Sequence, residues 1–130
     1  MSYSETRQII YDYINANYVG DVQYPNTPFT IPSSGKWIRL NFVDSTRNQM
    51  SIGSTKDYRQ RFILVINIFT ELDVGVDTGL TIADDLITLF AGKTINNKVV
   101  VKNCRLKTIG SDGTHYQHVL EIDCYKNEVV

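Results

Sequence analysis

The chain has 130 residues, of which 42% are hydrophobic and 21% are charged. This balance is typical of one folded domain spanning residues 1–130 and excludes an intrinsically disordered chain. Thirteen basic and fourteen acidic residues give a net charge of −1, which provides no global field for binding nucleic acid or an anionic membrane.

No segment is typical of secretion or membrane insertion. The start, MSYSETRQII, lacks a basic region followed by an apolar one, and the longest apolar-rich run, FILVINIF, is only eight residues long. Two cysteines, Cys104 and Cys124, are too few for a disulfide framework. We therefore expect synthesis in a reduced cytoplasm.

The first residues predict an amphipathic helix. Ser2 and Glu5 fit a capping box at its start, and Gly20 suits the region after its end. Its apolar face is expected to carry Ile9, Ile10, Tyr13, Ile14 and Ala16. The stretch that follows, YPNTPFTIPSSG, holds all three prolines and predicts an ordered extended loop.

Two strands are expected next. KWIRLNFV (36–43) alternates like a half-buried strand. RFILVINIF (61–69) is apolar on both faces apart from Asn67, which predicts a central strand covered on both sides. Between them, residues 44–60 predict a seventeen-residue loop, far longer than the usual connection of about 4–6 residues.

The second half of the chain repeats this order. Residues 77–91 predict a helix, with Asp77 or Thr78 capping its start and Gly92 following its end. KVVVKNCRL (98–106) and HYQHVLEIDCY (115–125) predict two more strands, separated by the turn GSDG.

The order α-β-β-α-β-β predicts an α+β fold. We expect a mainly antiparallel or mixed sheet of about four to five strands, with two helices packed on one face. The other face of the sheet would need cover or would meet a neighbouring subunit.

Residues able to perform catalysis or bind metal are sparse. His115 and His118 lie three apart on a predicted strand, point to opposite faces and make a poor metal pair. His118 is expected to be a packed structural histidine. Cys104 and Cys124 could contact each other across two strands, but no activating base can be identified for either thiol. We therefore expect no catalytic residue, no cofactor and no metal.

The predicted loop carries apolar residues that a disordered linker would not need. Met50, Ile52 and Tyr58 on a projecting arm are best explained by contacts with a partner, the alternative being that the arm folds back onto its own sheet.

Charge supports a partner contact. Residues 36–61 hold six basic and two acidic side chains, a net of +4, whereas residues 71–85 hold five acidic side chains and no basic one. Complementary patches at different places on one subunit suit head-to-tail association, which can close into rings. The expected contact residues are Met50, Ile52, Tyr58, Arg59, Asp84 and Asp85.

Four segments, in chain order, carry a family resemblance. They are YPNTPFTIPSSGKWIRLNF with Asn26, Phe29, Pro32, Trp37, Ile38 and Arg39; SIG at 51–53 with YR at 58–59; GLTIADDLITLF at 79–90; and DGTHYQHVLEIDCY at 112–125. Together they resemble the phage tail terminator (tail completion) proteins of long-tailed bacteriophages, in which N-x-x-F-x-P precedes a W-[ILV]-R strand. Arg61 departs from the pattern, since a small residue is common there.

This resemblance implies a structural virion assembly protein rather than an enzyme. Such a subunit would form a hexameric ring that caps the tail tube, ends tail polymerisation and provides the head-attachment surface. Its partners would be copies of itself, the tail tube protein and a head-connector or head-completion protein, with DNA only passing through the lumen and no membrane contact. Free subunits could be monomers in the host cytoplasm before they join the neck region of the virion tail.

Three alternatives remain open. The first is another neck component, namely a head-closure or head–tail joining protein. The second is a small enzyme using Cys104, Cys124 or His118. The third is a ligand-binding domain, which should have a sizeable apolar cavity with a few convergent polar groups. The assembly interpretation expects an exposed apolar arm and no such cavity.

Overall fold

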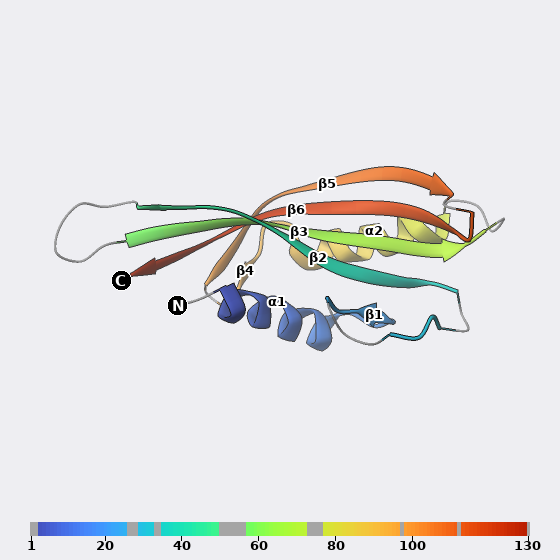
Figure 1. Cartoon of the computed structure of the whole chain (residues 1–130), viewed down its shortest axis with the longest axis horizontal. Helices are drawn as coiled ribbons and strands as arrows, with labels where there is room; N and C mark the ends of the chain where they lie inside the picture. Colours follow the sequence, from blue (N-terminus) through green and yellow to red (C-terminus); the bar gives the residue numbers. More distant parts are fainter. Residues whose placement is uncertain are drawn as a thin grey trace.

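Two helices pack on one face of a twisted six-stranded sheet in the computed structural model (Figure 1), which describes residues 3–25, 29–32, 35–49, 57–72, 77–96, 98–111 and 113–129. The elements in chain order are α1 (Tyr3–Asn17), β1 (Val22–Gln23), β2 (Trp37–Gln49), β3 (Asp57–Glu71), α2 (Asp77–Phe90), β4 (Thr94–Ile95), β5 (Val99–Ser111) and β6 (His115–Val129). The strand order is β1-β2-β3-β6-β5-β4, and among the described strands only the β1–β2 pair is parallel.

The α+β class and the two helices agree with the prediction, whereas the number and order of the strands do not. Six strands replace the expected four to five, because β1 and β4 are added to the predicted order α-β-β-α-β-β. Each is two residues long and pairs with one edge of a longer strand. A two-residue segment has no hydrophobic period, so the sequence contains no signal for it.

The core lies between the two helices and one face of the sheet. Alternate residues of β3 point into it, and the register places Ile66 between Leu40 of β2 and Leu120 of β6. The helices contribute Ile9, Ile10, Ile14, Ala83, Leu86 and Phe90. Ala16, expected on the apolar face of α1, is exposed instead.

The opposite sheet face is only partly covered. At one end, the Trp37 ring stacks on Phe69 with centroids 4.5 Å apart, and both side chains are buried. Further along β3, Ile63 and Val65 are only half-buried. The prediction that this strand is covered on both sides is therefore correct only near Trp37, because both helices lie on the other face.

Two glycines define how α2 sits. Gly92 adopts a φ of 68°, and the Lys93 amide donates to the Phe90 carbonyl at 3.2 Å, which ends the helix as the sequence predicts. Gly79 faces the sheet, where an added Cβ would lie 2.3 Å from Cδ2 of His118. The missing side chain therefore lets the first turn of α2 approach β6 closely.

The predicted seventeen-residue loop is largely strand. β2 continues to Gln49, β3 already begins at Asp57, and β6 runs beside them, so that Gln49, Tyr58 and Glu128 lie at corresponding positions. We call residues 44–49, 57–61 and 125–129 the arm. It begins beside the first turn of α1 and projects beyond both helices (Figure 1).

The reason for this error lies in the sequence of the arm. DSTRNQ (44–49) is polar throughout, so it lacks the alternation that indicates a half-buried strand. Backbone pairing with β3, which in turn pairs with the end of β6, extends the strand instead.

Candidate functional site

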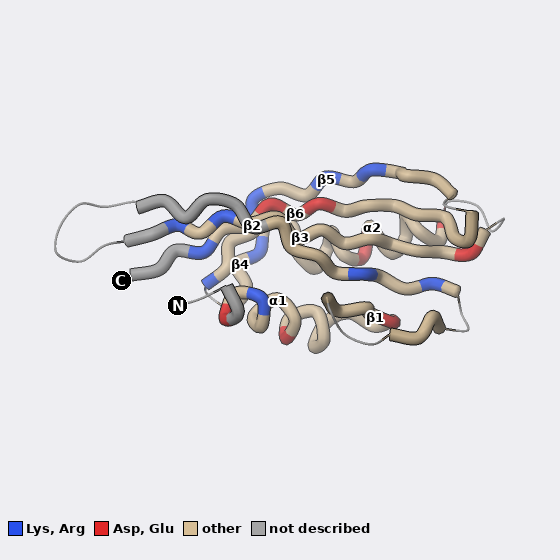
Figure 2. The backbone as a smooth tube through the Cα atoms, in the orientation of Figure 1, with Lys and Arg blue, Asp and Glu red and all other residues tan. Residues whose placement is uncertain are grey.

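The arm displays a positioned cation. The guanidinium carbon of Arg59 lies 4.1 Å from the centroid of the Tyr125 ring on the neighbouring strand. Such a cation–π contact contributes about 0.5–1 kcal/mol at an exposed site. Arg61, two residues along β3, is exposed, and Figure 2 shows basic residues on the described strands at this end of the molecule. Tyr125 therefore limits the orientations that the Arg59 side chain adopts.

The first turn of α1 holds the base of the arm. Lys126 of β6 is 4% exposed, and its Nζ lies 3.5 Å from Oε1 of Glu5, which also lies 3.4 Å from Nζ of Lys98. Lys126, and then Lys98, hold the pKa of the Glu5 carboxyl below its ordinary value. Beside them, the Thr6 hydroxyl donates to Oε1 of Gln60 at 3.1 Å. One α1 turn thus contacts both β3 and β6 where the arm begins.

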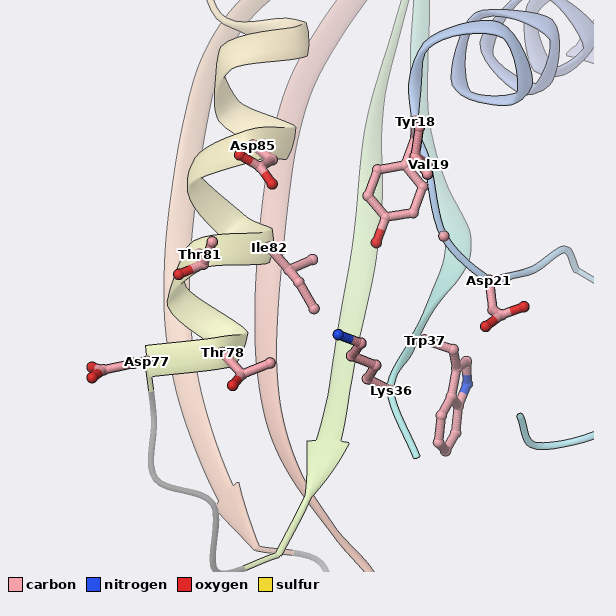
Figure 3. Close-up of a pocket in the computed structure, with 11 residues that line it drawn as sticks. Tyr18, Val19, Asp21, Lys36, Trp37, Asp77, Thr78, Thr81, Ile82 and Asp85 are labelled. Carbon is pink, nitrogen blue, oxygen red and sulfur yellow. The ribbon is translucent and has the colours of Figure 1, made fainter. Parts of the chain in front are cut away.

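The second feature is a cavity of about 420 Å³ between α2 and the segments that precede β1 and β2 (Figure 3). Its lining residues are Tyr18, Val19, Gly20, Asp21, Lys36, Trp37, Asp77, Thr78, Thr81, Ile82 and Asp85. In Figure 3, Ile82 projects from α2 toward Tyr18 and Lys36 on the other side. The assembly interpretation expected no sizeable apolar cavity with a few convergent polar groups. The lining of this cavity mixes apolar residues with charged and hydroxyl-bearing ones.

The cavity lining holds more acidic than basic residues. Three of its lining residues are aspartates and one, Lys36, is a cation. Within the described part of the chain, no ion pair involves Asp21, Asp77 or Asp85. The pKa of Tyr18 is raised by burial and, in addition, by the charges of Asp85 and Asp21. The carboxylates of Asp85 and Asp21 therefore act electrostatically on Tyr18 at the cavity wall.

The predicted contact residues that the structure describes lie in two separate places, the arm and α2. Met50 and Ile52 lie outside the described residues, and Tyr58 lies in β3 opposite Gln49 and Glu128. Arg59 is on the arm.

The two predicted aspartates are on α2, which lies in the other half of the molecule (Figure 1). Asp84 and Asp85 are both exposed, but only Asp85 lines the cavity. A single subunit therefore does not bring its Arg59 to its own Asp84 or Asp85.

Sequence reasoning missed most of the cavity. Tyr18 and Asp21 follow α1, Lys36 precedes β2, and Thr81 and Ile82 lie on α2. These residues share no motif or spacing, and they meet only because α1 and α2 pack on the same sheet face. The run of acidic residues in 71–85 was the one available signal, and it pointed to Asp85.

Four charged residues of β5 and β6 on the uncovered sheet face are paired with one another. Two nitrogens of Arg105 lie 2.6 and 3.1 Å from the carboxylate oxygens of Asp123, and Nζ of Lys107 lies 3.1 Å from Glu121. The hydrogen bond from Arg105 is the main reason that the pKa of Asp123 is lowered. Because these opposite charges are paired, this part of β5 and β6 forms neither a positive nor a negative patch.

The groups considered for catalysis are not activated. Burial is the main cause that raises the pKa of both thiols, that of Cys124 to about 12, whereas reactive cysteines have lowered values. The register places Cys104 opposite Ile122 rather than Cys124. His118 is buried as predicted; its Nδ1 lies 3.1 Å from the Thr108 hydroxyl, and burial lowers its pKa. Among the described residues, no three His, Cys, Asp or Glu side chains gather as a metal site would require.

Comparisons with known proteins place these features in context. The family model described as phage tail terminator protein matches residues 14–123. A solved structure whose name states no function has a TM-score of 0.66 and 20% identity, covering 98% of this chain and 96% of that chain. A chain from the virion of a native gene transfer agent particle has a TM-score of 0.62 and 15% identity, covering 98% and 100%.

At these identities the two solved structures show a shared fold alone. The search of curated proteins finds no match. No helix in the described part of the chain is long and apolar enough to cross a bilayer.

Proposed function

Because this chain belongs to the phage tail terminator protein family, and is therefore a structural protein of the virion tail, we propose that it forms a ring that caps the tail tube. The ring ends tube polymerisation and presents the surface to which the filled head attaches. Its partners are identical subunits, the tail tube protein and a head-connector or head-completion protein, and DNA only passes through the lumen.

The arm is the main observation that supports a ring. Its strands project beyond the helices that cover the rest of the sheet (Figure 1), and Arg59 and Arg61 on it are cationic. The acidic residues of α2 lie elsewhere on the same subunit (Figure 2). Two complementary surfaces at different places give a head-to-tail contact, and repetition of that contact by rotation closes a ring.

The proposed contact residues are those expected from the sequence. Met50, Ile52 and Tyr58 would supply apolar contacts, Arg59 the positive charge, and the α2 pair Asp84 and Asp85 the negative charge. Obligate interfaces often bury more than about 2,000 Å². A free monomer is compatible with this proposal if the end of the tube templates the ring.

Electron microscopy of particles produced without this protein tests the proposal. A terminator is required to stop tube growth, so we expect overlong tails without heads. Supplying the intact gene separately should restore tails of normal length that carry heads. Tails of normal length in the absence of the protein would refute termination and would instead indicate a head-closure or head–tail joining protein.

A further inference from the structure

We infer that the cavity beside α2 receives the arm of the next subunit, so that Arg59 of one copy lies at Asp85 of another. This inference rests on the proposed ring and specifies which surfaces form it. It also assigns the cavity to an occupant made of protein rather than to a small molecule.

Charge is the first reason. The cavity lining holds three aspartates against one lysine, and none of those aspartates is in an ion pair with a described residue of its own subunit. A guanidinium is the cation best suited to a carboxylate, because its fork of N–H donors matches the two oxygens. The arm carries three such groups, Arg47 on β2 and Arg59 and Arg61 on β3.

The apolar part of the lining is the second reason. Val19 is 96% exposed, and Ile82 on the opposite wall is half-buried. An arginine has a hydrocarbon stem that packs on such surfaces while its charged end reaches a polar group. Occupation by the arm would therefore cover Val19 and Ile82 and neutralise Asp85 in one contact.

The position of the two surfaces is the third reason. The arm projects from one end of the elongated subunit, and the cavity lies on the other half, beside α2 (Figures 1 and 3). Each subunit can therefore give one arm and receive one arm, which is the geometry of a closed head-to-tail ring. A second copy of this chain is favoured over another basic partner because one chain carries both complementary halves.

A charge-swap experiment in producing cells that lack the native gene tests this contact. Arg59→Glu alone places a carboxylate against the aspartates, and Asp85→Lys alone places a lysine against the arginines. Each variant alone should lower the yield of complete particles by more than about tenfold, because like charges then meet at every contact. Co-expression of the two variants should restore the yield, since rings that alternate them pair the introduced glutamate with the introduced lysine and leave the other contacts native.

Asp12→Lys is the matched control. It makes the same change from aspartate to lysine at an exposed position of α1 that neither lines the cavity nor belongs to the proposed contact. Asp12→Lys should leave the yield near that of the intact protein and should not rescue Arg59→Glu. Circular dichroism of each purified variant should match the intact protein, since all three positions lie outside the core.

Two outcomes would contradict the proposed contact. If co-expression fails to restore particles although each purified variant is folded, the arm does not enter this cavity. If Asp85→Lys is defective while Arg59→Glu is not, the cavity holds a different tail protein or a ligand, and the inference is wrong. Both outcomes leave termination intact as long as loss of the gene still gives overlong tails.

Discussion

At the residue scale, the contact between Gly79 and His118 determines how closely α2 approaches the sheet. His118 is 1% exposed, and its ring occupies the space that a side chain at position 79 would need. Its Nδ1 contacts Thr108 of β5, so the ring also links β6 to the neighbouring strand. Burial without a charged partner lowers the pKa of His118, which keeps the imidazole neutral near pH 7.

Gly79→Ala should destabilise the fold. The added Cβ would lie 2.3 Å from Cδ2 and 2.6 Å from Nε2 of His118, and overpacking of this kind costs about 1–3 kcal/mol. Alanine gains only about 1 kcal/mol over glycine in a helix, so we expect a net loss in the free energy of unfolding, measured with urea.

Two further variants distinguish the effect of overpacking on stability from the effect of helix propensity. Thr88→Ala, at an exposed position of the same helix, should change stability by less than about 0.5 kcal/mol. In a His118→Ala background, Gly79→Ala should cost less than it does alone, because the clashing ring is gone. Equal costs in both backgrounds would contradict the packing explanation.

At the element scale, α1 anchors the strands that form the arm. Glu5 contacts Lys126 of β6, Thr6 contacts Gln60 of β3, and Lys98 reaches Glu5 from just before β5. The pKa of Glu5 is lowered from 4.5 in the folded protein, principally by Lys126. The ionised carboxylate therefore stabilises the fold fully above about pH 4.5, and this stability is lost as the pH falls through the lowered pKa.

Glu5→Gln should loosen α1 at neutral pH, because it leaves the nearly buried Lys126 without its carboxylate. We expect a lower melting temperature and faster amide exchange in α1 at pH 7. The difference from the intact protein should shrink as the pH falls below 4.5, where Glu5 itself becomes protonated. Gln8→Ala, at an exposed α1 position, serves as the control. A difference that is constant with pH would contradict the electrostatic explanation.

At the scale of the whole molecule, the subunit is elongated, and the arm and α2 lie in different halves of it (Figure 1). The arm projects from one end, and acidic residues of α2 lie in the other half (Figure 2). Because the arm and α2 lie in different halves of the subunit (Figure 1), the arm does not contact α2 of its own chain. In the proposed ring, the arm meets α2 of a neighbouring copy instead.

Ring retention on isolated tails should fall as salt rises. The screening length is about 10 Å at 0.1 M salt and about 3 Å at 1 M, so exposed charges attract one another less at high salt. We expect a smaller fraction of tail ends to carry a ring at 1 M than at 0.1 M sodium chloride, counted by electron microscopy. Unchanged melting of the free subunit over this range would show that the salt acts on assembly. Retention that does not depend on salt would contradict a charge-based contact.

The two helices and the four long strands could be predicted because each contains a local hydrophobic pattern, either a period or, in β3, a continuous apolar run. α2 runs from Asp77 to Phe90, within one residue of the predicted 77–91, since its apolar stripe and Gly92 are local features. The strands were predicted at the right places but too short. Residues 44–49 and 57–60 have no continuous apolar face, so only their pairing partners show that they are strand.

Only part of the candidate site could likewise be predicted from the sequence. Arg59, Asp84 and Asp85 could be selected from charge alone, because the sign of a segment is a property of its composition. The sequence could not separate Asp84 from Asp85, because the two residues have the same charge and differ only in their tertiary surroundings. The cavity that distinguishes them is lined by residues as distant along the chain as Tyr18 and Asp85.

The sequence by itself determined the α+β class, the family and the charge of each segment, because these follow from local periods, motifs and composition. The tertiary structure decided that the long connection is a β-arm, that β1 and β4 complete the sheet, and that a cavity lies beside α2. Backbone pairing and the convergence of distant residues depend on positions in space, and no local pattern in the chain encodes them.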